Sequence, residues 1–395
     1  VGTNRKLYFT WDRYNNGVII KRLTSGTDVT IDNVSVKQVD RDNVPRIDYT
    51  GGGCPHILAE PQRTNLVTYS EDFSNAFWSK SSITVTDGFT SPSGDSTASK
   101  LTEGSTNINH QIYSAISGTA GNIYTLSGFF KKGERDVVQL LFGGAAFDEG
   151  SVYCNFDLTN GVLGSGTYLD ASITLISNGW YRCSFTATKT TTGNFNSTYC
   201  PKLTTTSSRA SAYLGDGTSG LYIFGAQAEV GSYPTSYIPT SGSTVTRNQD
   251  IFTRDGIGSL INSTEGVLFL EVALLDSSGF NWWLSITDGT STNSVAFVFE
   301  STGYTTARLD NASGNQAYLS YAGDYSQNRK IAFKWKASDF ALWIDGYEVV
   351  TTSIGSTFAS GVLNSLQFSH GSGSNTFNGK VKQLQVYDTA LTDDT

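Results

Sequence analysis

The stretch Phe333-Lys-Trp-Lys-Ala-Ser-Asp-Phe-Ala-Leu-Trp-Ile-Asp-Gly-Tyr347 decides the fold class of this chain. Its apolar and polar residues alternate with a period of two, which is the pattern of β-strands with one buried face. Asp345-Gly346 follows the second run and is typical of a hairpin turn. The stretch therefore predicts a pair of adjacent strands that leads into a hairpin turn.

Similar alternating runs, separated by Gly, Asn or Ser, continue along the whole chain, and we find no amphipathic helix in the pattern. The composition agrees, because 41 Gly, 22 Phe and 20 Tyr accompany only 7 Pro and 16% charged residues. A length of 395 residues exceeds one ordinary sandwich. The sequence therefore predicts an all-β chain of tandem antiparallel β-sandwiches.

Three alternating strands with polar exits, at 29–39, 221–230 and 381–387, mark the expected domain ends. We expect residues 1–45 to be a partial N-terminal β unit, the tail of an upstream sandwich. Residues 46–240 and 251–395 would then form two complete sandwiches, joined by a linker at 241–250. The absence of Met and the start at Val1 suggest a fragment or a processed chain.

The charge of the chain, −8 with a pI near 4.9, argues against nucleic acid as a partner, since phosphate binding requires clustered Lys or Arg. No apolar run approaches the roughly 20 residues of a membrane helix, so we expect no membrane insertion. Four widely spaced cysteines, Cys54, Cys154, Cys183 and Cys200, form no zinc motif. Free thiols are the favoured expectation, while Cys154 with Cys183, or Cys183 with Cys200, remain open as disulfide pairs.

The segment Leu58-Ala-Glu-Pro-Gln-Arg-Thr-Asn-Leu-Val-Thr-Tyr-Ser-Glu-Asp-Phe73, with the following Trp78 and Ala98-Ser-Lys-Leu101, resembles the opening of carbohydrate-binding-module-like jelly rolls in bacteriophage tail-fibre and head-fibre proteins. Segments 124–131, 178–183 and 225–240 are similar to the same family. The stretch 32–39 resembles the last strand of such a module.

Beyond residue 250, the stretch 333–347 and the closing Gly379-Lys-Val-Lys-Gln-Leu-Gln-Val-Tyr-Asp-Thr-Ala-Leu391 resemble concanavalin-A-like, laminin-G-like lectin domains. The two resemblances imply a jelly roll followed by a lectin-like sandwich. They also imply a structural protein of the virion, at the tail or capsid surface, with other virion proteins as partners. Such a fibre would be a homo-oligomer, and the family favours a trimer.

A sugar site on a sandwich needs flat aromatic rings flanked by polar side chains. Trp282 and Trp283 precede a polar turn, and adjacent strand residues face opposite sides, so one of the two must point away from the core. Trp78 and Tyr113 are weaker candidates, because Trp78 lies in an opening segment that usually packs across the core. The predicted carbohydrate-binding residues are Trp282, Trp283, Tyr304, Tyr321, Tyr325, Trp78 and Tyr113.

Metal and catalytic sites have little support in the sequence. Calcium could use the carboxylates of Phe147-Asp-Glu149 or Asp393-Asp394, but no EF-hand spacing is present. The three histidines lie far apart, outside any catalytic motif. Glu271 and Asp276 have an odd spacing that places them on opposite faces of a regular strand, which disfavours a retaining glycosidase.

We therefore expect a non-catalytic adhesion protein of a phage particle that binds glycans of the host surface. Two alternatives stay open at this point. One is a purely structural decoration or connector protein, whose surface aromatic residues are buried against other virion subunits. The other is a polysaccharide-degrading enzyme, a glycosidase or a lyase.

Overall fold

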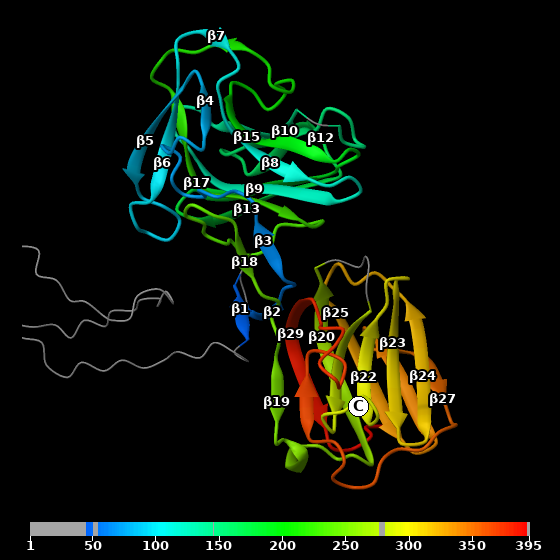
Figure 1. Ribbon diagram of the computed structural model, residues 1–395. Coiled ribbons are helices and arrows are strands. Elements are labelled where there is room, and N and C mark those ends of the chain that lie inside the picture. The colour runs from blue at the N-terminus through cyan, green and yellow to red at the C-terminus, as the bar shows by residue number, and fades with distance from the viewer. Residues whose placement is uncertain (1–44, 50–53, 145, 276–280, 393–395) are drawn as a thin grey trace, which may run out of the picture. The chain divides into compact units, whose positions relative to one another are not determined.

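The computed structural model describes residues 45–49, 54–144, 146–275 and 281–392 (Figure 1). Nearly all regular structure in these ranges is β-strand, and the one helix among them is the three-residue 3-10 helix η1 (Gly258–Leu260). The expected all-β class with tandem antiparallel sandwiches is confirmed. The strands expected in the N-terminal unit, as far as residue 39, lie outside the described residues.

The first sandwich consists of two six-stranded antiparallel sheets (Figure 1). One has the order β12 (Val162–Thr167), β11 (Tyr153–Asp157), β10 (Val137–Gly143), β15 (Gly193–Lys202), β8 (Gln111–Gly118), β4 (Ser79–Ser81). The other has the order β13 (Asp170–Ser177), β14 (Trp180–Thr188), β9 (Ile123–Lys132), β17 (Gly220–Val230), β6 (Ala98–Glu103), β5 (Ile83–Phe89). Two short pairs accompany these sheets, β7 (Asn107–Ile108) with β16 (Tyr213–Leu214) and β3 (Arg63–Asn65) with β18 (Val245–Arg247).

The core of the first sandwich forms where the alternating apolar residues of the two sheets meet. Leu126 and Phe130 of β9 and Phe142 of β10 are fully buried in one cluster with Tyr199 of β15. Trp78 belongs to the same cluster, and its indole nitrogen donates to the Tyr69 carbonyl at 2.9 Å. The burial of this bulky apolar surface is the main stabilising term of the jelly roll.

The second sandwich pairs a seven-stranded sheet with a six-stranded sheet. The seven-stranded sheet has the order β1 (Arg46–Asp48), β2 (His56–Ala59), β29 (Gly379–Tyr387), β20 (Glu265–Leu274), β25 (Arg329–Lys336), β26 (Asp339–Ile344), β27 (Tyr347–Thr352). The six-stranded sheet has the order β19 (Thr253–Asp255), β28 (Ser365–Gln367), β21 (Trp282–Thr287), β22 (Ser294–Phe299), β23 (Tyr304–Asn311), β24 (Gly314–Ala322). Strands β1 and β2 thus precede the first sandwich in the chain, but β2 pairs with β29, the last strand of the second sandwich, and β1 pairs with β2.

The hairpin turn predicted at Asp345-Gly346 is confirmed. Asp345 has φ 51° and Gly346 has φ 87°, and two positive φ angles are the requirement of the tight turn that matches strand twist. Strands β25 and β26 alternate as expected, with Phe333 and Trp335 fully buried in the core of the second sandwich. The sequence pattern and the turn chemistry therefore specify the same local structure.

The cysteines are free thiols in the structure. Cys154, Cys183 and Cys200 are buried in the first sandwich, while Cys54 is exposed. Burial raises the pKa of the Cys154 thiol to about 12 and that of Cys200 to about 11, because a thiolate is poorly solvated there. Free thiols, the favoured expectation, agree with this state.

Carboxylates held by hydrogen bonds are concentrated in the first sandwich. Hydrogen bonds lower the pKa of Asp216, chiefly from Ser219, and that of Asp95, chiefly from Thr97. Burial alone would raise the pKa of Glu103, but hydrogen bonds from Arg135 and Tyr213 outweigh it. The carboxyl groups with a lowered pKa are Asp72, Asp95, Glu103, Glu134, Asp157 and Asp216 in the first sandwich and Asp288 and Asp324 in the second.

We expect acid to destabilise the first sandwich more than the second. A carboxyl group whose pKa is lowered by folding contributes stability above its unfolded pKa, and this contribution is lost as the pH falls through the folded pKa. The loss should begin near the ordinary Glu value of 4.5 and grow toward lower pH. Calorimetry between about pH 3 and pH 7 checks this, and equal shifts of the two unfolding transitions would contradict it.

Candidate functional site

The adjacent tryptophans of β21 lie on opposite faces of their sheet, as the alternation predicted. Trp282 belongs to the core cluster of the second sandwich, so its ring is not available to a ligand. Trp283 lies on the outer face with Ala296 and Val298. The His370 ring contacts it edge-on with centroids 4.3 Å apart, and the Arg308 guanidinium lies 5.4 Å from its centroid. Trp283 is consequently only 6% exposed and presents no open stacking face.

The other predicted rings are dispersed over the chain. Tyr325 and Trp78 are buried in the two cores, which corrects their assignment as sugar-binding candidates. Tyr113 is half-buried on β8 of the first sandwich. Tyr304 and Tyr321 are partly exposed on the neighbouring strands β23 and β24. The predicted set therefore does not converge on one site.

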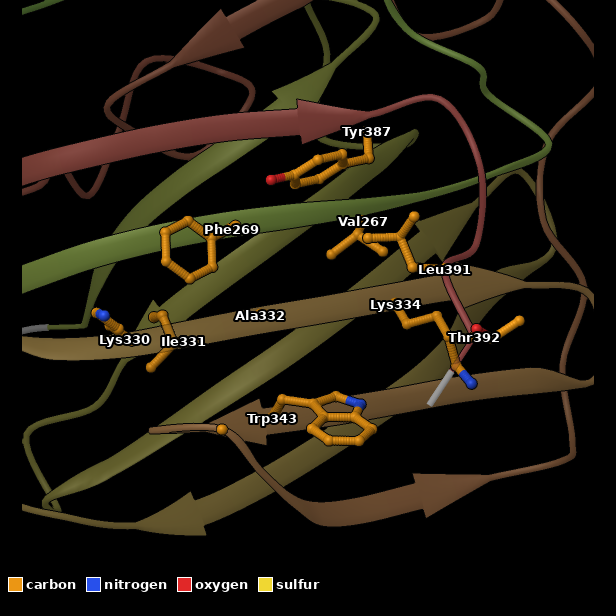
Figure 2. Close-up of a pocket in the computed structure, with 11 residues that line it drawn as sticks. Val267, Phe269, Lys330, Ile331, Ala332, Lys334, Trp343, Tyr387, Leu391 and Thr392 are labelled. Carbon is orange, nitrogen blue, oxygen red and sulfur yellow. The ribbon is translucent and has the colours of Figure 1, made fainter. Parts of the chain in front are cut away.

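A different aromatic group lines a pocket of about 320 Å³ on the outer face of the seven-stranded sheet. This volume is at the lower end of the ~300–1,000 Å³ that small-molecule sites occupy. Figure 2 shows Phe269, Trp343 and Tyr387 around the small side chain of Ala332. The lining residues are Val267, Phe269, Lys330, Ile331, Ala332, Lys334, Trp343, Gly346, Tyr387, Leu391 and Thr392.

Strand alternation explains how the rings reach this face. On β26, Phe340, Leu342 and Ile344 point into the core, so Trp343 points outward and stays half-buried. On β20 the buried Leu268 and Leu270 flank Phe269 in the same manner. Four neighbouring strands, β29, β20, β25 and β26, thus bring the lining residues together.

Trp343 is not among the carbohydrate-binding residues predicted from the sequence. The signal that identifies it is the alternation itself. Since three apolar residues at even positions of β26 are buried, an odd-numbered tryptophan between them must face outward. The same argument identifies Phe269, but nothing local in the sequence shows that β20 and β26 lie on either side of β25.

The polar groups of the pocket are fixed by nearby partners. The Lys334 ammonium lies 3.0 Å from a carboxylate oxygen of Asp339. The Asp345 carboxylate, at the rim near Gly346, pairs with Arg329 at 2.6 Å and accepts the backbone N–H of Lys330 at 3.0 Å. Among the residues that the structure describes, the lining includes no Asp, Glu or His. The pocket can therefore stack rings on an apolar ligand surface and donate hydrogen bonds from its lysines.

Potential metal ligands and acid–base groups are dispersed among the described residues. No group of three or more His, Cys, Asp or Glu side chains in this part of the chain is placed to hold a metal ion. Glu271 pairs with Lys382 at 2.6 Å, while Asp276, its proposed counterpart, lies outside the described residues. The imidazole of His110 is buried against the carbonyls of Ser82 and Tyr213. Within the described ranges, no helix has the length and apolarity to span a membrane.

Comparisons with known proteins give only distant likenesses. No protein-family model and no curated protein matches the chain. The CBM40 module of the Ruminococcus gnavus IT-sialidase bound to α2,3-sialyllactose is 17% identical, with a TM-score of 0.32, over 36% of this chain and 89% of the module. The same module bound to α2,6-sialyllactose is 16% identical, with a TM-score of 0.30, over 36% of this chain and 95% of the module.

Domains LG4–5 of the mouse laminin α1 chain are 10% identical, with a TM-score of 0.24, over 73% of this chain and 89% of that chain. Because these TM-scores are low, the ligands of those proteins indicate no ligand for this chain. The fold rests on the strand pairing and burial described above, and that pairing defines two β-sandwiches in tandem.

Proposed function

We propose that this chain is a non-catalytic glycan-binding protein whose site is the pocket formed by Phe269, Trp343 and Tyr387. The observation that carries the proposal is the placement of three partly exposed rings around Ala332 in one pocket, with lysine side chains at its edge. Rings of this kind stack on the apolar C–H face of a pyranose, and ammonium groups donate hydrogen bonds to hydroxyls.

We further propose display on a phage particle, at the tail or capsid surface, with host-surface glycans as the ligand and other virion proteins as partners. This step is supported by the resemblance of the segments 58–73 and 225–240 to fibre proteins. Several copies on one particle would make individually weak sites sufficient, because later contacts become effectively intramolecular. The described lining consists of aromatic, aliphatic and lysine side chains with Gly346 and Thr392, a composition that supports binding of a glycan.

Replacing Trp343 by Ala should reduce glycan affinity about tenfold, since a stacked ring contributes roughly 1.5 kcal/mol. The measurement is a glycan array of the purified chain, with and without calcium, followed by titration calorimetry on the strongest ligand. Tyr318→Ala is the matched control, because this tyrosine is 54% exposed on the opposite, six-stranded sheet.

A second variant tests the pocket without removing a ring. Ala332→Leu adds volume between Phe269, Trp343 and Tyr387 and should reduce affinity as strongly as the tryptophan variant. If both variants bind like the parent chain while Trp283→Ala abolishes binding, the site belongs on the other sheet. If the folded parent chain binds no glycan, the proposed function fails and the decoration or connector alternative gains support.

A further inference from the structure

One complete edge of the first sandwich is formed by a single segment, residues 162–177. Strand β12 is the end strand of one six-stranded sheet, and β13 is the end strand of the other. The two strands lie beside each other, and the chain passes between the sheets at Tyr168-Leu169. Among the described residues, β12 pairs with one strand, β11, and β13 pairs with one strand, β14. The Ser165 N–H of β12 also donates to the Thr205 carbonyl at 2.8 Å.

This edge exposes large aliphatic side chains. Leu175 is 60% exposed and Leu169 is 52% exposed, although both could have been replaced by polar residues without cost to the core. The exposed aliphatic residues of the edge are Val162, Leu163, Leu169, Leu175 and Ile176. Contiguous apolar surface of this kind is typical of a protein–protein contact.

The edge carries little of the charge that usually protects end strands against pairing, although β13 has a bulge between Leu175 and Ser177. Residues 158–181 contain one charged residue, Asp170, and neither Lys nor Pro. Natural sheets commonly place such residues on exposed end strands to prevent association. Of the opposite end strands of the same two sheets, β4 differs from this edge by carrying Lys80. Strand β5 resembles β13, because each has one aspartate and a bulge.

We propose that β13 pairs with β13 of a second copy of this chain, in antiparallel orientation about a twofold axis, and that the aliphatic residues of the edge are buried in this contact. The proposal goes beyond glycan binding and does not depend on it. In a symmetric contact, the second copy provides both the extended strand that pairs with β13 and the apolar surface that covers the exposed aliphatic residues. No other protein is required.

The single charge of the edge favours this occupant and this orientation. Asp170 is the first residue of β13, so antiparallel pairing places the two aspartates at opposite ends of the contact, about 20 Å apart for an eight-residue strand. That distance exceeds the screening length of about 8 Å at physiological salt. Parallel pairing would place the two carboxylates side by side, which disfavours that orientation. A partner with a charged surface would bury its charges against the leucines of the edge, which disfavours such a partner.

The oligomeric state of the full chain tests the proposal. Sedimentation equilibrium at concentrations up to ~100 µM should show a dimer. The double variant Leu169→Glu, Leu175→Glu should be monomeric with an unchanged thermal transition. Leu214→Glu is the matched control, because Leu214 is 69% exposed on β16 of the same sandwich, and it should remain a dimer. A parent chain that is monomeric or trimeric, or a double variant that stays dimeric, overturns the proposal.

Cross-linking tests the orientation independently of any loss of fold. In a Cys54→Ser background, which removes the exposed thiol, Thr174→Cys lies near the middle of β13. Antiparallel pairing about a twofold axis there places the two introduced thiols opposite each other, and they should form an intermolecular disulfide under mild oxidation. Asp170→Cys lies at the end of the strand and should not. Cross-linking of Asp170→Cys at the same rate or faster would contradict antiparallel pairing.

Discussion

Replacement of Glu103 by Ala should lower the free energy of unfolding of the first sandwich by about 4 kcal/mol, as expected when one partner of a buried ion pair is removed. The Glu103 side chain is fully buried at the end of β6 and lies 2.5 Å from the Arg135 guanidinium. It also accepts the Tyr213 hydroxyl at 2.7 Å and the backbone N–H of Asp216 at 3.1 Å. The variant leaves all three donors without their acceptor.

Denaturant unfolding followed by tryptophan fluorescence measures this effect, because Trp78 and Trp180 report on the first sandwich. Glu134→Ala is the control: this side chain is 55% exposed and pairs with Lys100 at 2.8 Å, so its loss should cost less than about 1 kcal/mol. A Glu103→Ala chain as stable as the control would show that the buried cluster contributes no net stability.

The second large effect is expected at Asn65, whose side chain is fully buried. Its amide nitrogen donates to the carbonyls of Ala226 at 3.1 Å and Ile238 at 2.9 Å. Its oxygen accepts the N–H groups of Val67 at 3.1 Å and Ala228 at 3.2 Å. Asn65→Ala leaves four backbone groups without this partner, and we expect a loss of about 4 kcal/mol.

Thermal unfolding of the Asn65→Ala chain checks the prediction, with Asn194→Ala as the control. The oxygen of Asn194 accepts one hydroxyl, that of Ser117 at 3.0 Å, at an exposed position. If both variants unfold at the temperature of the parent chain, the asparagine does not hold the opening and closing segments together.

Asn65 and its partners show what the segments 58–73 and 225–240 do in this chain. Asn65 lies in the segment 58–73, and Gln227 and Glu229 lie in the segment 225–240. Glu229 accepts the Thr235 hydroxyl at 2.6 Å, and Gln227 accepts the N–H of Ile238 at 2.8 Å. The motif residues thus fasten the closing segment across the outer face of β17 and have a structural role there.

The sequence predicted the fold class and the strand pair in the stretch 333–347, because period-two alternation and turn residues are local signals. In the structure this stretch contains the end of β25, β26 and the turn at Asp345-Gly346. The pairing of β2 with β29 could not be predicted from the sequence, because neither strand contains a local signal that specifies a partner so distant in the chain. Alternation along each strand is enough to place Phe269 and Trp343 on the outer face of the sheet. The proximity of the two rings depends on the order of the strands in the sheet, which no local pattern specifies.

The pairing of His56–Ala59 with Gly379–Tyr387 has a consequence for biosynthesis. Residues 56–59 are synthesised about 320 residues before 379–387, the strand with which they pair. Long-range pairing of this kind is slow because the loop must close before the contacts form. The first sandwich can form in this interval, whereas the seven-stranded sheet is complete only when β29 has been made. A chain shortened before residue 379 would leave β1 and β2 without the strand that joins them to this sheet.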